Sequence, residues 1–170
     1  DTNKNQYWGA TIVDKEENGI LIREKCLVKC RKNMISVSVP KGITSIQDYA
    51  FAHCKILQTV SLPNTLRTIG KSAFLLCTTL ISVRIPGSVS SIGTGAFACC
   101  SSLKSAVLDS SMQIYNDLKT IPNAIFYQCT SLTQVELPYG LEMIGLKAFD
   151  GCKALKEIKM WSDNNPNHIP

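Results

Sequence analysis

A unit of about 23 residues recurs along the chain, and a phenylalanine marks its phase. These rings recur at a constant interval, with one longer step before the fourth, at Phe51, Phe74, Phe97, Phe126 and Phe149. A cysteine follows each ring after three positions, and a leucine follows each cysteine after three more. Self-similarity at a fixed period in the twenties predicts a solenoid, because single coils cannot bury their apolar side chains and must stack into one core.

Each unit divides into short segments with distinct local signals. In one coil, residues 59–62 alternate polar and apolar side chains, which predicts a half-buried strand that Pro63 ends. Residues 66–69 are expected to form a second short extended or 3₁₀ segment on the opposite wall, followed by a bend at Gly70. Residues 73–77, with the pattern Ala-Phe-x-x-Cys, are expected to form one short helical turn with the ring pointing inward.

These residues resemble the BspA-like, or treponemal-type, leucine-rich repeat, whose pattern is close to L-x-x-I-x-L-P-x-x-L-x-x-I-G-x-x-A-F-x-x-C. The resemblance covers Ile35 to about Met160 and recurs five times. It implies a leucine-rich-repeat solenoid, mainly short β-strands with 3₁₀ or short helical turns, in about five 23-residue coils with an N-terminal β-hairpin cap. It also implies a secreted or surface protein, and many members of this class bind host proteins.

The irregular parts of the chain of 170 residues set its expected organisation. We expect an N-terminal β-hairpin capping segment at 1–34, the solenoid at 35–161 with an insertion at 109–117, and a polar tail at 162–170. Within the capping segment, residues 7–13 should form a strand, 14–19 a charged turn and 20–22 its return. Trp8 is interpreted as a ring over the open end of the core, and Trp161 as a cover at the other end. The first residue is not Met and no signal peptide follows, which fits a processed N-terminus or a piece of a longer chain.

The fourth coil departs from the repeat. Asp109 stands where the other coils place a proline, and six extra residues precede the next apolar pair. The insertion carries Met112, Ile114 and Tyr115. These side chains either fold back over a stretched coil or form an apolar contact patch for a partner or a second copy, since insertions in solenoids extend as loops on one face.

Five of the eight cysteines occupy one repeat position: Cys54, Cys77, Cys100, Cys129 and Cys152. This regularity predicts an interior ladder of free thiols that behave as small apolar side chains. Cys26 and Cys30 lie outside the regular coils and are the better candidates for a disulfide. A zinc site that includes them is not expected, because a second pair with suitable spacing is missing.

No group of residues points to catalysis. The chain has only two histidines, His53 and His168, and its carboxylates are scattered without a pair at catalytic spacing. Glycine-rich phosphate loops are missing, and no apolar run reaches the length of a membrane span. We therefore expect no enzymatic activity, no cofactor, no metal and no membrane-spanning segment.

The residues that flank the buried position of each predicted strand should point outward and form a lane. The candidate binding residues in this lane are Thr59, Ser61, Ser82, Arg84, Ser105, Val107, Gln134 and Glu136. The lane is rich in hydroxyl groups, weakly charged and poor in the Tyr, Trp and Arg side chains that dominate hot spots. It is interpreted either as a solvated sheet face or as a binding surface assisted by the insertion.

The predicted function is a non-enzymatic protein–protein interaction module, secreted or at the cell envelope, that binds host or envelope proteins in the manner of an adhesin. The expected contact surface is the concave face together with the insertion. One alternative is a structural protein that self-associates through open solenoid ends or through the insertion. Another is binding of a glycan or anionic surface by basic residues, at Lys25, Lys29, Arg31, Lys32 and Lys41. Because no aromatic residues interleave this basic cluster, nucleic-acid binding is not expected.

Overall fold

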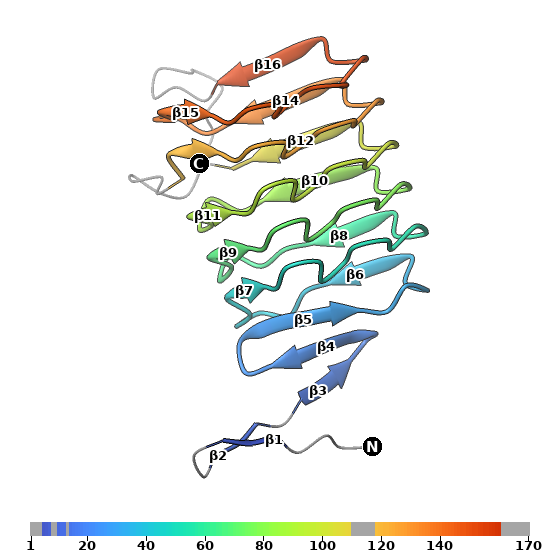
Figure 1. The fold of residues 1–170 in the computed structure, drawn as a ribbon, viewed down its shortest axis with the longest axis vertical. Coiled ribbons are helices and arrows are strands. Elements are labelled where there is room, and N and C mark those ends of the chain that lie inside the picture. The colour runs from blue at the N-terminus through green and yellow to red at the C-terminus, as the bar shows by residue number, and fades with distance from the viewer. Residues whose placement is uncertain (1–4, 8–9, 13, 110–117, 161–170) are drawn as a thin grey trace.

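The computed structural model describes residues 5–7, 10–12, 14–109 and 118–160, and the chain forms one stack of coils (Figure 1). One strand from each coil joins a row that we call the front face: β6 (Ser36–Ser38), β8 (Thr59–Ser61), β10 (Ser82–Ile85), β12 (Ser105–Leu108), β14 (Gln134–Leu137) and β16 (Glu157–Met160). A second row, the back face, holds shorter strands: β7 (Ser45–Ile46), β9 (Thr68–Ile69), β11 (Ser91–Ile92), β13 (Thr120–Ile121) and β15 (Met143–Ile144).

Neighbouring strands within each row pair in parallel, except that the front-face ladder is interrupted between β8 and β10 and the back-face ladder between β11 and β13. Val83 lies opposite Ala106 on the front face, and Ile46 lies opposite Ile69 on the back face. Between β8 and β10, the Ile81 N–H donates to the Gln58 carbonyl at 3.1 Å. The predicted fold class, a solenoid of short strands in coils of about 23 residues, is confirmed.

A third set of backbone contacts joins the coils where a helical turn was expected. The Cys77 N–H donates to the Phe74 carbonyl at 3.2 Å, as in a single helical turn. Leu76 then adopts a φ of +59°, which a right-handed helix does not permit, and its N–H donates to Ala98 of the next coil at 3.0 Å. The segment is therefore a series of tight turns, and the described part of the chain contains no helix.

The core is a column of apolar side chains between the two faces. The five phenylalanine rings stack in order, with centroid distances of 4.5, 4.8, 5.9 and 5.9 Å. Leucines at the next repeat position, such as Leu57 and Leu80, are fully buried beside them. Among the described residues no polar or charged side chain is buried, so the interior is held together by apolar packing and backbone hydrogen bonds.

The N-terminal end is covered by an antiparallel meander of β3 (Asp14–Glu17), β4 (Ile20–Arg23) and β5 (Cys26–Cys30), and β5 then pairs with β7. Ile20, Ile22 and Leu27 from this meander are buried in the core, so it caps the first coil. The expected charged turn at 14–19 is wrong in extent, because residues 14–17 form a strand and only Asn18 and Gly19, both with positive φ, make the turn.

Residues 7–13 also differ from the single strand that we expected. β1 (Asn5–Tyr7) and β2 (Ala10–Ile12) form a separate antiparallel pair before the meander. Trp8 and Trp161 lie outside the described residues. The division of the chain into capping segment, solenoid and tail stays a prediction.

The C-terminal end of the described chain leaves interior repeat positions open. β16 pairs with β14 on one side, and no described strand pairs with its other edge (Figure 1). Ile158 is 44% exposed, whereas Val135 at the same position of the preceding coil is fully buried. Ile144 is 50% exposed and its counterpart Ile121 is fully buried.

Candidate functional site

The outward side chains of the front face form two parallel columns. The register of β10, β12 and β14 places Ser82, Ser105 and Gln134 side by side in one column. The same register gives the second column: Arg84, Val107 and Glu136. The lane that we expected from the sequence is thus brought together by the pairing of the strands.

Exposure changes along this lane. The candidate residues on the first strands are exposed and those on the later strands are half-buried: Thr59, Ser61, Ser82 and Arg84 in the first group, Ser105, Val107, Gln134 and Glu136 in the second. The Thr59 hydroxyl donates to the Ser36 hydroxyl at 2.8 Å, which links neighbouring coils across the surface. The role of these residues in binding stays a prediction.

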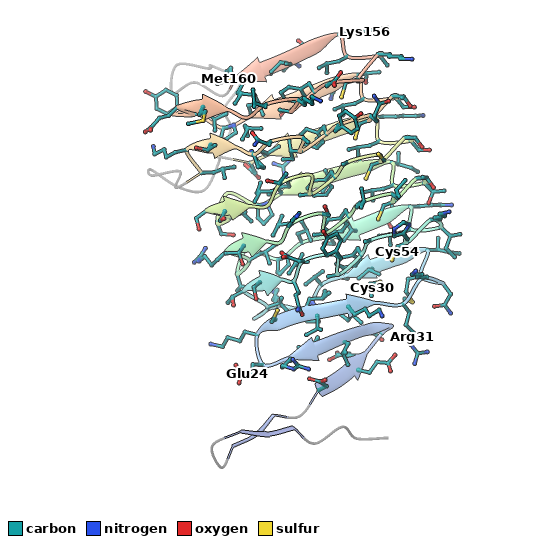
Figure 2. The ribbon with its side chains drawn as sticks, in the orientation of Figure 1. Glu24, Cys30, Arg31, Cys54, Lys156 and Met160 are labelled. Carbon is teal, nitrogen blue, oxygen red and sulfur yellow. The ribbon has the colours of Figure 1, made fainter. Side chains whose placement is uncertain are left out.

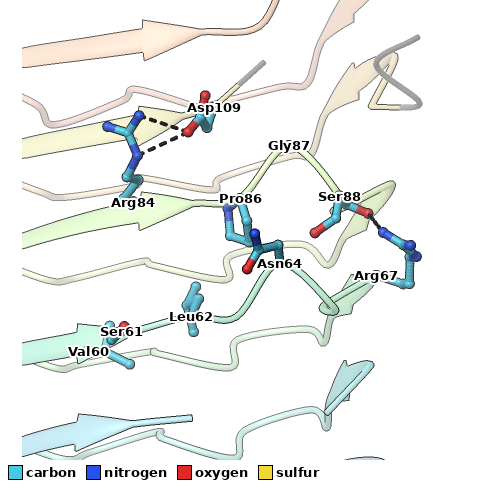
Figure 3. A pocket seen from close by; sticks show the side chains of 10 residues that line it. All are labelled: Val60, Ser61, Leu62, Asn64, Arg67, Arg84, Pro86, Gly87, Ser88 and Asp109. Carbon is cyan, nitrogen blue, oxygen red and sulfur yellow. Dashed lines mark hydrogen bonds and ion pairs between the residues drawn. The ribbon is translucent and has the colours of Figure 1, made fainter. Parts of the chain in front are cut away.

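A hollow of about 680 Å³ lies where β8, β10 and β12 end and the chain turns toward the back face (Figure 3). Its walls include two lane residues and eight others: Val60, Ser61, Leu62, Asn64, Arg67, Arg84, Pro86, Gly87, Ser88 and Asp109. The hollow combines apolar surface with two arginines and one carboxylate. Sequence reasoning missed it, because residues as far apart as Val60 and Asp109 meet there only once the coils are stacked.

The charged groups of the hollow are held in place. Arg84 Nε and Nη2 lie 3.0 and 2.8 Å from the same Oδ2 atom of Asp109. The Arg84 side chain is 62% exposed and that of Asp109 is 13% exposed. On the other wall, Arg67 Nη1 donates to the Ser88 carbonyl at 3.1 Å (Figure 3).

The backbone at Asp109 accounts for part of the shape of the hollow. The Asp109 N–H donates to the Ile85 carbonyl at 2.8 Å and extends the ladder between β10 and β12. Pro86, at the same repeat position one coil earlier, has no N–H to donate. The equivalent hydrogen bond is therefore missing between the coils of β8 and β10, which belong to separate sheets, on the side of the hollow that Leu62 and Pro86 border. Met112, Ile114 and Tyr115 of the insertion lie outside the described residues.

The repeat cysteines line the interior as free thiols. Cys77, Cys100, Cys129 and Cys152 each donate from the thiol to the backbone carbonyl of the phenylalanine in the preceding coil, at 3.1–3.2 Å. Hydrogen bonds with Cys129 and Cys77, together with burial, raise the pKa of Cys100 well above its usual value. A buried thiol with a raised pKa, such as that of Cys100, is unsuited to nucleophilic chemistry.

Cys30 adds a further member to this ladder. Its side chain is buried, and its thiol donates to the Arg31 carbonyl at 3.3 Å. Cys54, the first regular member, donates to the same carbonyl at 3.9 Å, and Figure 2 shows Cys30 and Cys54 on neighbouring coils. The expected disulfide between Cys26 and Cys30 is wrong, because both are free and they stand at opposite ends of β5. Four residues of extended strand span about 13 Å, too far for a disulfide. The interval between Cys30 and Cys54 is close to one repeat, and this is the signal that could have identified the extra member.

The basic cluster of the alternative hypothesis lies near the N-terminal end. All five side chains are exposed: Lys25, Lys29, Arg31, Lys32 and Lys41. Arg31 forms an ion pair with Glu16 of β3, which reduces the positive charge of the cluster. A second hollow, of about 350 Å³, is bordered by Lys29, Arg31, Lys32 and Glu16.

The described residues also bear on metal binding and membrane insertion. No group of three or more His, Cys, Asp or Glu side chains there is arranged to hold a metal ion. In the same residues, no helix has the length and hydropathy needed to cross a bilayer.

Comparison with known proteins identifies the repeat. A family model described as the BspA type leucine rich repeat region, in 6 copies, matches residues 20–117 and 109–168. A comparison with curated proteins found no match.

Several solved structures have a similar fold. A leucine-rich cell surface protein from Faecalibacterium prausnitzii is 24% identical with a TM-score of 0.74, over 90% of this chain and 38% of that one. A leucine-rich repeat protein from Eubacterium ventriosum is also 24% identical, with a TM-score of 0.77, over 89% of this chain and 40% of that one. The pneumococcal vaccine antigen PcpA is 17% identical with a TM-score of 0.56, over 92% of this chain and 49% of that one. This chain spans half or less of the length of these proteins, and at such identities the likeness shows the fold alone.

Proposed function

Because this chain belongs to the BspA-type leucine-rich repeat family, we propose that it is a non-enzymatic protein-binding module that acts at the cell surface or outside the cell. The contact surface in this proposal is the front face together with the hollow at its edge. An adhesin-like role, with a host or envelope protein as the partner, is the specific form of the proposal. The description of one structural relative as a cell surface protein and of another as a vaccine antigen supports the location.

The observation that carries this proposal is the lane of outward side chains on the front face. The alternate residues of each strand, such as Val83 beside Ser82 and Arg84, point inward and form the core. The outward residues are therefore not needed for packing, and they are free to vary with the partner. Stacking sets their spacing at about 4.8 Å between coils, which suits contact with several residues of a partner protein.

Two matched serine variants test this proposal. Ser82 is exposed on β10 of the front face, and Ser91 is exposed on β11 of the back face. The assay measures binding to a panel of immobilised extracellular-matrix and envelope proteins. We expect Ser82→Arg to weaken a saturable interaction by about tenfold or more, and Ser91→Arg to leave it unchanged. Equal losses in both variants, or no binding by the parent chain to any protein of the panel, would overturn the proposal.

Self-association is a second candidate function, and the exposed interior positions at the C-terminal end favour it. Two β16 strands that pair antiparallel with Ile158 opposite itself would place Glu157 opposite the partner's Lys159. Cross-strand pairs of opposite charge stabilise such a contact, and an open edge strand favours pairing with another chain. The two copies would form a closed dimer, because each presents the same strand to the other.

Charge exchange tests this second candidate. Lys159→Glu sets two carboxylates against each other and should lower the dimer fraction seen by light scattering across a concentration series. The double variant Glu157→Lys/Lys159→Glu restores opposite charges and should restore the dimer. A parent chain that stays monomeric at all concentrations rules this candidate out.

A further inference from the structure

We propose that the hollow beside β8, β10 and β12 receives a carboxylate side chain from an extended, acidic segment of the partner protein, and that Asp109 occupies this place on Arg84 in the free protein. This inference rests on the proposed function, since it names the chemistry of the partner at one edge of the front face. The relevant features are the ion pair of Arg84, the second arginine and the apolar wall.

Arg84 is already engaged in the way that an incoming carboxylate would engage it. Two of its N–H groups converge on a single oxygen of Asp109, at 3.0 and 2.8 Å. Hydrogen bonds between guanidinium and carboxylate are charge-assisted and directional, so this contact fixes the guanidinium against the sheet. The arginine nevertheless remains 62% exposed and is accessible to a second carboxylate.

Asp109 is specific to this coil. Four other coils place a proline at this repeat position: Pro40, Pro63, Pro86 and Pro138. Proline carries no carboxylate, so within the described coils these four positions cannot form the ion pair that Asp109 makes with an arginine of the preceding coil. Coils with proline at this position stack without such an ion pair, so the Arg84–Asp109 pair is not needed for the stacking itself.

The other walls favour a peptide as the occupant. Arg67, anchored by its bond to the Ser88 carbonyl, adds a second cation to the hollow. Val60, Leu62 and Pro86 supply apolar surface for an aliphatic part of the ligand. Two arginines and one aspartate leave a net charge of about one positive unit at neutral pH, which matches a single carboxylate better than a polysulfated glycan.

Asp109 and the ligand then compete for the same guanidinium. Replacing Asp109 with Asn retains the shape and an acceptor oxygen but removes the competing charge. Asp109→Asn should therefore tighten the binding of an acidic peptide, whereas Arg84→Gln should weaken it. A purely structural ion pair predicts no gain of affinity for either variant.

The experiment is a titration of the full chain with oligoglutamate, with oligoglutamine as the neutral control, followed through the arginine Nε–H resonances in NMR spectra. We expect oligoglutamate to shift the Arg84 and Arg67 signals. Its affinity should rise about threefold in Asp109→Asn and fall about threefold in Arg84→Gln. Arg31→Gln, in the basic cluster at the N-terminal end, is the matched control and should leave the affinity unchanged.

Several results would overturn this inference. They are equal responses to both peptides, an affinity that falls in Asp109→Asn, or an effect of Arg31→Gln as large as that of Arg84→Gln. Thermal melting of each variant reports whether it is folded. If Asp109→Asn does not fold, Arg84→Gln still provides the test, because the Arg84 side chain is exposed. Because the titration uses no partner protein, the inference about the hollow and the proposed protein-binding function can fail separately. The titration can be negative while the Ser82→Arg assay is positive, or positive while that assay is negative.

Discussion

Stacked phenylalanine rings give each coil its largest buried side chain. Phe97 lies between two other rings, with centroids 4.8 Å from Phe74 and 5.9 Å from Phe126, and is fully buried. Truncation removes apolar contacts on both sides and leaves a cavity that neighbouring coils cannot close without shifting their backbones. We expect Phe97→Ala to lower the free energy of unfolding by about 3–5 kcal/mol.

Urea unfolding measures this loss, with Ile81→Ala as the control. Ile81 is 43% exposed, so its truncation should cost far less. A loss below about 1 kcal/mol for Phe97→Ala would contradict the inward packing of the ring.

The thiol ladder makes stability depend on pH in the alkaline range. Burial raises the pKa of Cys152 from its ordinary 9.0 to about 11. Below pH 9.0 the thiol is protonated in both the folded and unfolded states and the shift has no effect. Between these two values the unfolded state loses its proton while the folded state retains it, so stability falls as the pH rises.

Urea titrations on either side of pH 9 measure this dependence, with Cys152→Ala as the reference. The variant lacks this titrating group, so its stability should decline less steeply with pH than that of the parent chain. Parallel declines in the two proteins would show that Cys152 does not contribute to the alkaline transition.

At the scale of the element, a glycine forms the bend after three of the five back-face strands, at Gly70, Gly93 and Gly145. A Cβ atom added to Gly93 would lie 2.3 Å from the Lys71 backbone nitrogen of the preceding coil. Backbone atoms cannot move aside as the end of a flexible side chain can. Gly93→Ala should therefore separate two coils locally and cost about 3 kcal/mol, at the upper end of overpacking penalties.

Gly42→Ala is the matched control for this prediction. An added Cβ at Gly42 meets nothing within 4 Å, and the cost arises from its φ of +95° alone. We expect a loss of about 1 kcal/mol by chemical denaturation. Similar losses of stability in the two variants would mean that the close approach of the coils at Gly93 does not account for the cost of adding a Cβ atom there.

The elements also show which features were predictable from the sequence. The period predicted the stacked coils with one inward position per strand, because Val83, Ala106 and Val135 recur with the repeat and must face one core. The Ala-Phe-x-x-Cys segment was expected to form one short helical turn, and its local pattern does not reveal the positive φ at Leu76 or the hydrogen bonds to the next coil. The backbone N–H groups of this segment find hydrogen-bond acceptors in the next coil, as Leu76 does in Ala98. A prediction made from one coil at a time cannot include these bonds.

The candidate site was predictable only in part for a related reason. Ser61 and Arg84 followed from strand alternation, which depends on local sequence. Arg67 and Asp109 are almost two repeats apart in the sequence and meet in the hollow only through stacking. The proline position that Asp109 occupies was visible, but its ion pair with Arg84 depends on the register between β10 and β12.

At the scale of the whole molecule, the two ends of the described solenoid differ. At the N-terminal end, β3, β4 and β5 cover the first coil, and Ile20, Ile22 and Leu27 are buried there. At the other end, Lys156 begins and Met160 ends a front-face segment whose outer edge has no partner among the described strands (Figure 2). In a solenoid each coil is stabilised mainly by its neighbours, so stability should decrease toward this end.

A second phenylalanine variant tests that gradient. Phe149 stacks on Phe126 at 5.9 Å, but no further described ring covers its other side, and it is only half-buried. Phe149→Ala should therefore cost about 1–2 kcal/mol, less than the loss in Phe97→Ala. Hydrogen exchange should show why: in Phe149→Ala the amides of residues 141–160 should lose protection while those of 20–108 keep it, because opening stays local. Phe97→Ala should instead reduce protection on both sides of its coil, since it interrupts the stack at the centre. Equal losses and identical exchange patterns in the two variants would mean that the solenoid unfolds as one unit without a weak end.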